Sequence, residues 1–221
     1  MTPGFHVKRQ SDRPLAFHVK PNQQSELVAA SRRLGLHLTH DQVEALLTYA
    51  ALLRTKAVPL GLIGEKDEGG ILSRHVIDSL RAATAVRPSD RLAYDLGSGA
   101  GLPGIPVGLA CPDLSVQLVE SRLRRAGFME LAVDELGLPN AKVRLGRVED
   151  LTDPADLCFA RAFAPLPRAW EAAARLLAPG GRLVHFLGAK AALPALPGAS
   201  AVELLSVPLL DSGGALAIIT R

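Results

Sequence analysis

A strand, a glycine-rich turn and a helix follow one another over residues 92–110, and this order constrains the fold more than any other part of the chain. The turn reads Asp95-Leu96-Gly97-Ser98-Gly99-Ala100-Gly101-Leu102-Pro103-Gly104, with apolar residues on both sides of it. Glycine has no side chain, so it lets the backbone adopt a positive φ and lets a ligand lie against the main chain. Such a turn between a strand and a helix is typical of nucleotide-cofactor sites.

The glycine spacing is compatible with two classes of cofactor. Gly99, Gly101 and Gly104 match the G-x-G-x-x-G pattern of dinucleotide-binding turns, which is weak evidence when it stands alone. Asp95 followed by Gly97, Gly99 and Gly101 instead resembles the first motif of S-adenosylmethionine-dependent methyltransferases. A pyrophosphate favours a helix N-terminus without a nearby acid. S-adenosylmethionine has no phosphate and carries two cationic groups, so a carboxylate at the strand end can help to hold it.

An acidic residue ends the second predicted strand. Glu120 follows the apolar run 116–119 and lies about 20 residues after the glycine loop, where a carboxylate can accept hydrogen bonds from both hydroxyls of a ribose. Both cofactor classes contain that ribose, so Glu120 indicates a nucleoside without deciding between them. The alternative is that Glu120 caps the helix that follows.

Strands and helices alternate from residue 91 onward. Apolar runs predict helices at 104–111, at 122–136 and around Trp170, and strands at 91–96, 115–120, 142–145, 157–160, 182–187, 202–209 and 215–220. Alternation implies a mostly parallel sheet with helices on both faces. The last two runs follow each other with turn residues between them, which indicates an antiparallel end. We expect an α/β fold with a seven-stranded, mostly parallel, Rossmann-like sheet of the class I methyltransferase type.

The first part of the chain predicts helices and no strands. One helix is expected from Ser25 to about Leu34, a second after the capping-box pair Thr39 and Gln42, and a third with residues 72, 76, 80 and 83 facing inward. We therefore expect a basic, flexible arm over residues 1–24, an N-terminal helical cap over 25–88 and a methyltransferase domain over 89–221.

Composition excludes several classes of protein. Apolar residues make up 48% of the 221 residues, which rules out general disorder. No apolar run approaches the roughly 18 residues that cross a bilayer, and the N-terminus has no hydrophobic signal core, so we expect a cytoplasmic protein. Cys111 and Cys158 are far apart and the six histidines are scattered, so no metal site is predicted. The net charge of +3 comes from the first 20 residues, which indicates either nucleic-acid contact or a solvated arm.

Four segments together resemble one family. They are Arg74-His75-Val76-Ile77-Asp78-Ser79-Leu80, the glycine loop with its continuation Leu102-Pro103-Gly104-Ile105-Pro106, Gly146-Arg147-Val148-Glu149, and Arg161-Ala162-Phe163-Ala164. In this order and spacing, over roughly residues 25–187, the chain resembles the bacterial small-subunit ribosomal RNA guanine-N7 methyltransferases, the glucose-inhibited division protein B family. The resemblance implies transfer of a methyl group from S-adenosylmethionine to ring nitrogen 7 of a guanine in 16S ribosomal RNA.

The resemblance also implies roles for particular residues. Contacts to S-adenosylmethionine fall on Gly97, Leu102, Val148, Glu149 and Arg161, which join Asp95, Gly99, Gly101 and Glu120 from the glycine loop and second strand. No catalytic base is assigned, because nitrogen 7 carries no proton, and Arg161 and Phe163 are candidates for positioning. The candidates for contact with RNA or for shaping its site are Arg74, His75, Asp78, Arg122, Arg124 and Arg125.

Several of these residues have a structural alternative. Spacing alone favours a solvated ion-pair ladder for Arg74, Asp78 and Arg81, and a solvated helix start for each of the three arginines at 122–125. Arg161 could form a surface salt bridge, while His75 and Phe163 could be core residues.

The chain also departs from the family pattern. Residues 56–62 lack the usual Trp-Asn pair and a further Asn, and Leu187-Gly188 replaces a Lys-Gly pair, with Lys190 two residues later. These departures concern substrate contacts more than cofactor contacts. The expected partner is the small ribosomal subunit or its RNA. We expect the protein to act as a monomer and not to bind a membrane. The alternatives are a methyltransferase for another RNA, a protein or a small molecule, a noncatalytic RNA-binding module, and a nicotinamide oxidoreductase.

Overall fold

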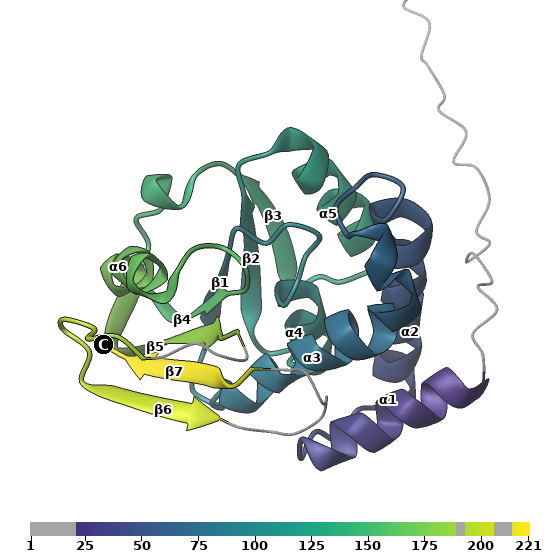
Figure 1. Cartoon of the computed structure of the whole chain (residues 1–221), viewed down its shortest axis with the longest axis horizontal. Coiled ribbons are helices and arrows are strands. Elements are labelled where there is room, and N and C mark those ends of the chain that lie inside the picture. The colour runs from purple at the N-terminus through teal and green to yellow at the C-terminus, as the bar shows by residue number, and fades with distance from the viewer. Residues whose placement is uncertain (1–20, 189–192, 206–213) are drawn as a thin grey trace, which may run out of the picture.

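The computed structural model describes residues 21–188, 193–205 and 214–221. Its centre is a seven-stranded sheet in the order β3-β2-β1-β4-β5-β7-β6 (Figure 1). The strands are β1 (Leu92–Leu96), β2 (Ser115–Glu120), β3 (Ala141–Leu145), β4 (Ala155–Ala160), β5 (Leu177–Phe186), β6 (Ala201–Leu205) and β7 (Leu216–Thr220). The predicted fold class and strand number are confirmed.

The strand directions follow the predicted pattern. β1 pairs in parallel with β2 and β4, β2 with β3, and β4 with β5, whereas β7 runs antiparallel to both β5 and β6. The end of the sixth predicted strand and most of the turn before the seventh fall on 206–213, which lie outside the described residues. β5 begins five residues earlier than predicted, because Leu177 already pairs with Ala155 of β4. The register then shifts before Arg182 pairs with Leu157, and Gly180 in this stretch has a φ of 79°.

Helices cover both faces of the sheet (Figure 1). α4 (Gly104–Ala110) and α5 (Leu123–Glu135) pack on one face, and α6 (Leu166–Leu176) packs on the other. Successive strand residues alternate between the two cores: Phe159 belongs to the core under α4 and α5, while Cys158 belongs to the core under α6. Parallel strands buried on both faces require this continuous apolar character.

The N-terminal helices share the core of α4 and α5. They are α1 (Pro21–Arg33), α2 (His40–Leu52), the π-helical η1 (Leu53–Ala57), the 3₁₀ segment η2 (Glu65–Gly70), the π-helical η3 (Ile71–Ile77), α3 (Asp78–Leu80) and the 3₁₀ segment η4 (Arg81–Ala85). Leu27, Leu46 and Leu80 join one apolar cluster with sheet residues. This packing places the N-terminal helices beside the carboxyl ends of the central strands.

Two predicted helix features are confirmed and two are adjusted. Thr39 and Gln42 form the capping box before α2, and the four inward positions of the third helix are buried. α1 begins at Pro21 and not at Ser25, since proline fits the first turn of a helix. The third predicted helix is a continuous run of π, α and 3₁₀ turns over 71–85, so its hydrogen-bond pattern changes twice.

The described residues contain no helix long and apolar enough to cross a membrane. Within the same part of the chain, no group of three His, Cys, Asp or Glu side chains is placed to bind a metal ion. Cys111 and Cys158 are free thiols, the first half-buried and the second buried.

Candidate active site

Two adjoining hollows lie at the carboxyl edge of the sheet, where ligands bind in open α/β folds. The strand-end hollow, of about 360 Å³, is lined by residues of β2, β3, β4 and their loops: Gly97, Val119, Glu120, Ser121, Arg122, Arg125, Gly146, Arg147, Val148, Glu149, Ala162 and Phe163. The cap-side hollow, of about 380 Å³, is lined by the glycine loop and by the N-terminal segment: Leu62, Ile63, Gly64, Asp67, His75, Gly97, Ser98, Gly99, Ala100, Leu102, Arg125, Arg161 and Ala162.

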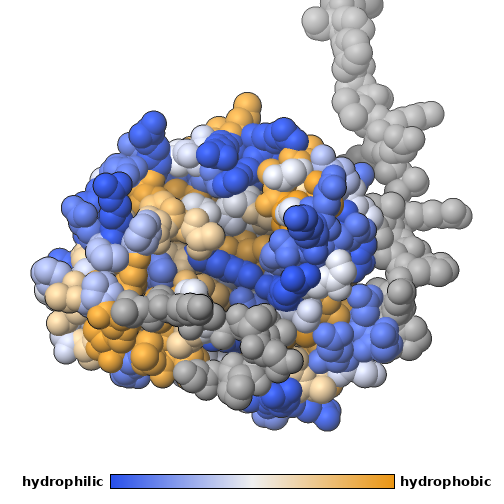
Figure 2. Space-filling model, in the orientation of Figure 1, coloured by the Kyte–Doolittle hydropathy of each residue, from blue (hydrophilic) through white to orange (hydrophobic). Residues whose placement is uncertain are grey.

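The two hollows form one cleft. Gly97, Arg125 and Ala162 line both of them, so a ligand in one hollow continues directly into the other. Figure 2 shows this face of the molecule hollowed near its centre, with hydrophilic side chains along much of the rim. Both volumes lie within the range usual for small-molecule sites.

The glycine loop forms the floor between the hollows. Gly97, Gly99 and Gly101 have φ values of 65°, 64° and 89°, a left-handed conformation that side chains disfavour. A Cβ atom at Gly97 would also lie 2.7 Å from Cδ2 of Phe163. Gly97 is therefore required both by the turn and by the close approach of the loop after β4.

Asp95 holds the loop from beneath. Its buried Oδ2 accepts a hydrogen bond from the backbone N–H of Gly104 at 2.9 Å and another from the hydroxyl of Ser98. Burial raises the pKa of Asp95 to about 6, although both hydrogen bonds oppose the increase. Oδ1 is buried and has no hydrogen-bond partner among the described residues. Asp95 thus joins the end of β1 to the start of α4, and it lies beneath the loop without lining either hollow.

Glu120 lies at the end of β2, in the wall of the strand-end hollow. Its carboxylate accepts hydrogen bonds from the backbone N–H groups of Gly99 at 3.1 Å and of Arg122 at 3.0 Å, and lies 3.5 Å from a guanidinium nitrogen of Arg125. The bond to Arg122 reaches the residue before α5 (Leu123–Glu135) and does not cap the helix, whose N-cap has no side-chain hydrogen bond. Each carboxylate oxygen can accept more than one hydrogen bond, so these contacts leave capacity for ribose hydroxyls.

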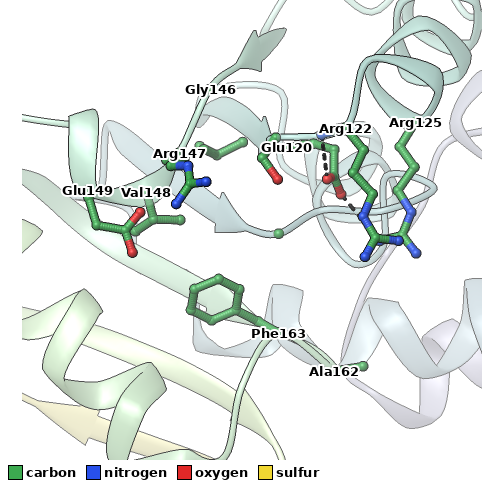
Figure 3. A pocket seen from close by; sticks show the side chains of 12 residues that line it. Glu120, Arg122, Arg125, Gly146, Arg147, Val148, Glu149, Ala162 and Phe163 are labelled. Carbon is green, nitrogen blue, oxygen red and sulfur yellow. Dashed lines mark hydrogen bonds and ion pairs between the residues drawn. The ribbon is translucent and has the colours of Figure 1, made fainter.

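Val148 and Glu149 lie in the short turn η5 (Val148–Asp150), after β3. Figure 3 shows Val148 across the strand-end hollow from the ring of Phe163, with Glu120 and Arg122 toward the other end. Arg175 of α6 donates hydrogen bonds to the carbonyl oxygens of Val148 and Glu149, at 2.9 and 3.1 Å. Arg175 was not among the predicted site residues, because it lies 26 residues after Glu149 on a helix with no motif.

Arg161 connects the end of β4 to the N-terminal helices. Its guanidinium donates to the carbonyl oxygens of Arg74 at 2.7 Å and His75 at 3.2 Å and to the hydroxyl of Ser79 at 2.9 Å, and lies 3.2 Å from a carboxylate oxygen of Asp78. Burial lowers the pKa of Arg161, and the Asp78 carboxylate opposes this effect. This arrangement is a largely buried network and not a surface salt bridge.

The ion-pair ladder indicated by spacing alone is wrong. Asp78 and Arg81 are 8% and 3% exposed and lie 2.7 Å apart, and Arg81 also donates to the carbonyl oxygen of Gly214 at 2.7 Å. Arg74 does not join them, because its side chain is exposed and pairs with Asp67 at 3.4 Å. The contacts of Asp78 with Arg161, just after β4, and of Arg81 with Gly214, just before β7, hold this side of the helix inward, which local spacing does not reveal.

His75 is a wall residue of the cap-side hollow. Its Nε2 atom is buried and makes no hydrogen bond to any residue that the structure describes. Burial lowers the pKa of His75, and the nearby Arg161 guanidinium lowers it further, so the neutral imidazole is favoured. His75 is therefore neither a satisfied core histidine nor a surface residue.

The three arginines at the start of α5 (Leu123–Glu135) differ in their placement. Arg122 and Arg125 line the strand-end hollow, and Arg125 also reaches the cap-side hollow. Arg124 lies outside both hollows and donates a hydrogen bond to the carbonyl oxygen of Leu60, which ties α5 to the N-terminal segment. Phe163 lines the strand-end hollow and not the cap-side hollow.

Tyr49 is a second supporting residue that the sequence analysis missed. It is fully buried in α2, and its hydroxyl donates a 2.6 Å hydrogen bond to the carbonyl oxygen of Ala100 in the glycine loop. Burial raises the pKa of Tyr49 well above its usual value, and the Asp95 carboxylate raises it further. A buried tyrosine hydroxyl usually has a hydrogen-bond partner. A tyrosine on the inward side of a predicted helix could therefore have indicated a supporting hydrogen bond at this position.

The seven-stranded sheet with an antiparallel end, the glycine loop after β1 and the acid at the end of β2 define a class I methyltransferase fold. The O-methyltransferase TomG from Streptomyces achromogenes, solved in complex with SAM, shares this fold: the match has a TM-score of 0.56 and 19% identity, and covers 90% of this chain and 96% of that chain.

The particular family is shown by sequence. The model of the family described as rRNA small subunit methyltransferase G, GidB, matches residues 42–213, and the chain belongs to this family. The protein named Ribosomal RNA small subunit methyltransferase G from Ralstonia nicotianae is 38% identical over 209 residues, which cover 88% of this chain and 94% of that protein. The protein of the same name from Cupriavidus necator is 33% identical, with coverage of 90% and 95%. The predicted family is confirmed.

Proposed function

We propose that this protein transfers the methyl group of S-adenosylmethionine to ring nitrogen 7 of a guanine in 16S ribosomal RNA. Membership of the rRNA small subunit methyltransferase G family supports the enzyme class, the cofactor and the ribosomal RNA substrate. The structural observation that carries the proposal is the continuous cleft, in which a nucleoside-sized hollow beside Glu120 opens into a second hollow beneath the N-terminal helices.

The residues of the cleft fit S-adenosylmethionine. Glu120 would accept the ribose hydroxyls, and Val148 and Phe163 would pack on opposite faces of the adenine. The glycine loop at Gly97 and Gly99 leaves the main chain open to the methionine part, and the unpartnered Oδ1 of Asp95 adds negative charge beneath it. When bound, the cofactor supplies an electrophilic methyl group on a positively charged sulfur.

The chain's own contribution to the reaction is positioning. Nitrogen 7 of guanine has a lone pair and no proton, so no general base is required. With both ligands bound, the residues of the cleft would need to hold the nucleophile in line with the methyl carbon and sulfur, at roughly 3–3.5 Å from the carbon, and such alignment can lower a barrier by roughly 7–11 kcal/mol. Arg161 serves as a positioning residue, because it fixes the N-terminal helices against the strand end that carries Ala162 and Phe163.

The RNA must present the guanine outside a duplex, since base edges in an RNA helix are poorly accessible. Arg122 and Arg125 line the cleft, where they can meet phosphates. Outside the first 20 residues the chain has no net charge, whereas binding to RNA of any sequence relies on positive charge. This balance supports recognition of the shape of a ribosomal particle. We extend the proposal to a cytoplasmic monomer that acts on the small ribosomal subunit.

Methyl transfer to isolated subunits tests the proposal. Small subunits from a strain that lacks this enzyme are incubated with tritium-labelled cofactor, alongside large subunits, bulk protein and the small-molecule fraction. Label in the RNA of the small subunit is the expected result. Label only in protein or in a small molecule would support another methyltransferase. Binding of NAD, without binding of S-adenosylhomocysteine, would support an oxidoreductase. Cofactor binding without transfer to any fraction would support a noncatalytic RNA-binding role.

A further inference from the structure

The cap-side hollow contains an acid that the cofactor contacts do not use. Asp67 lies in η2, in the N-terminal segment, and lines this hollow together with Leu62, Ile63 and His75. The glycine loop and Arg161 line the same hollow from the sheet. The hollow therefore has one wall from the cofactor-binding loop and another wall that is free to meet a second ligand.

The carboxylate of Asp67 is available to a ligand. Its ion pair with Arg74 joins Oδ1 to a guanidinium nitrogen at 3.4 Å, and the two side chains are 41% and 48% exposed. An ion pair this exposed contributes little to stability, so a ligand can displace or share it at small cost. The pair engages Oδ1, which leaves Oδ2 for a second hydrogen bond.

The chemistry of this wall matches one nucleobase. Guanine presents two adjacent donors, N1–H and an exocyclic N–H, on its Watson–Crick edge, and an ionised carboxylate offers two acceptor oxygens and no donor. Adenine has an acceptor in place of N1–H and would be repelled. The apolar side chains of Leu62 and Ile63 can pack against a base, and bases taken out of a stack are commonly held by apolar contacts and by hydrogen bonds to this edge.

His75 supplies a second, independent observation. The residue lines the same hollow as Asp67, and its buried Nε2 has no partner within the described part of the chain. The O6 atom of guanine is an acceptor adjacent to N1, and a neutral imidazole protonated at Nε2 can donate to it. A guanine held in this way satisfies a polar atom that the protein leaves unsatisfied.

We propose that Asp67 is the residue that selects guanine, by accepting hydrogen bonds from N1–H and the exocyclic amino group of the target base. This inference rests on the proposed function. Nitrogen 7 lies on the neighbouring Hoogsteen edge, which shares O6 with the Watson–Crick edge, so a base whose N1–H and amino group bind Asp67 keeps nitrogen 7 clear of that carboxylate. Nitrogen 7 then faces the wall shared by both hollows at Gly97 and Ala162, where the cofactor part of the cleft begins.

The test compares Asp67→Asn with Glu68→Gln, a matched change at the neighbouring exposed acid, which lines neither hollow. Substrates are small subunits reconstituted with guanosine or with inosine, which lacks the exocyclic amino group, at the position that the wild-type enzyme methylates. We expect Asp67→Asn to lower kcat/KM on guanosine subunits by about 10- to 100-fold. Its calorimetric Kd for S-adenosylhomocysteine should stay within about twofold of wild type. Glu68→Gln should match wild type in both measurements.

The inosine comparison separates base recognition from a structural role. Wild type should lose about 10-fold or more in kcat/KM on inosine subunits, whereas Asp67→Asn should lose little further activity. Asp67→Glu, which keeps the carboxylate, should retain the preference for guanosine. An unchanged preference in Asp67→Asn would overturn the inference, and so would a large loss of cofactor affinity, which would place the cofactor's ammonium group on Asp67. Failure of wild type to methylate any subunit would instead refute the proposed function.

Discussion

A guanidinium nitrogen of Arg161 lies 2.7 Å from the carbonyl oxygen of Arg74, so the end of β4 is bonded directly to the π-helical turn η3. The same guanidinium reaches Asp78, whose other carboxylate oxygen is paired with Arg81. Two segments that the family pattern identified separately are therefore one unit. The strand end that borders the strand-end hollow and the helix that borders the cap-side hollow keep a fixed relation to each other.

Replacing Arg161 should therefore affect both stability and methyl transfer. Arg161→Ala leaves Asp78 with one partner fewer in a largely buried network, which should lower the free energy of unfolding by about 3 kcal/mol. Arg161→Lys keeps the charge but loses the planar fork that reaches several acceptors, so an intermediate loss is expected. Denaturant unfolding and kcat/KM measure the two effects. An Arg161→Ala variant with wild-type activity and stability would contradict the role.

A methyl group at Gly97 should disturb the cleft in two ways. Gly97→Ala places a side chain at a φ of 65° and pushes a Cβ against Phe163, so we expect at least about a 10-fold weaker Kd for S-adenosylhomocysteine. Gly137→Ala is the matched control, because Gly137 has a φ of 55° and open space around it, away from the cleft. The control should lose stability but keep its cofactor affinity. Equal Kd values for the two variants would show that the close approach of Gly97 to Phe163 does not shape the cofactor site.

The buried Asp95 carboxyl should make stability depend on pH. Its folded pKa of about 6 lies above the unfolded value, so the folded state binds the proton more tightly and loses stability as pH rises between the two pKa values. The free energy of unfolding of wild type relative to Asp95→Asn should fall by about 2–3 kcal/mol from pH 4 to pH 7. Urea titrations across this range measure it. A constant difference would show that Asp95 titrates normally.

The hydroxyl of Tyr49 should support the glycine loop. Tyr49→Phe removes the donor to the carbonyl oxygen of Ala100, which should cost about 1 kcal/mol of stability and weaken cofactor binding several-fold. Tyr94→Phe is the same chemical change on the opposite side of the sheet, at a hydroxyl that donates to the backbone carbonyl oxygen of Asp153. It should leave cofactor affinity unchanged. The prediction fails if calorimetry gives the same Kd for both variants.

Methyl transfer should not depend on one ionising base. Since nitrogen 7 of guanine reacts without losing a proton, single-turnover rates on bound subunits should be nearly flat from about pH 7 to about pH 9. Rates measured at saturating subunit exclude effects of RNA binding. A steep tenfold rise per pH unit would contradict this mechanism.

The sequence predicted the gathering of residues at the strand ends better than the contacts that support the cleft from the helices. Asp95, Gly97 and Glu120 lie at the carboxyl ends of parallel strands, and such ends meet at one edge of the sheet. The roles of Tyr49 and Arg175 could not be predicted, because both residues lie on helices without a motif. Tyr49 is 51 positions from its partner Ala100, and Arg175 is 26 positions from its partner Glu149.

The Asp78 network shows why local spacing was misleading. Helical spacing places Arg74, Asp78 and Arg81 near one another, but it does not tell which side of the helix is buried. The contacts of Arg81 with Gly214 and of Asp78 with Arg161 join segments far apart in the sequence. Only the packing of these segments decides that Asp78 and Arg81 are core residues while Arg74 remains exposed.

Mass mapping of ribosomal RNA tests most directly whether this protein methylates a 16S ribosomal RNA guanine at nitrogen 7. Ribosomal RNA from the source strain, from a strain without this protein and from that strain carrying the gene again is digested and its modified guanines are mapped. We predict one 7-methylguanine in the small-subunit RNA that disappears without the protein and returns with the gene. Identical maps in all three strains would contradict the account.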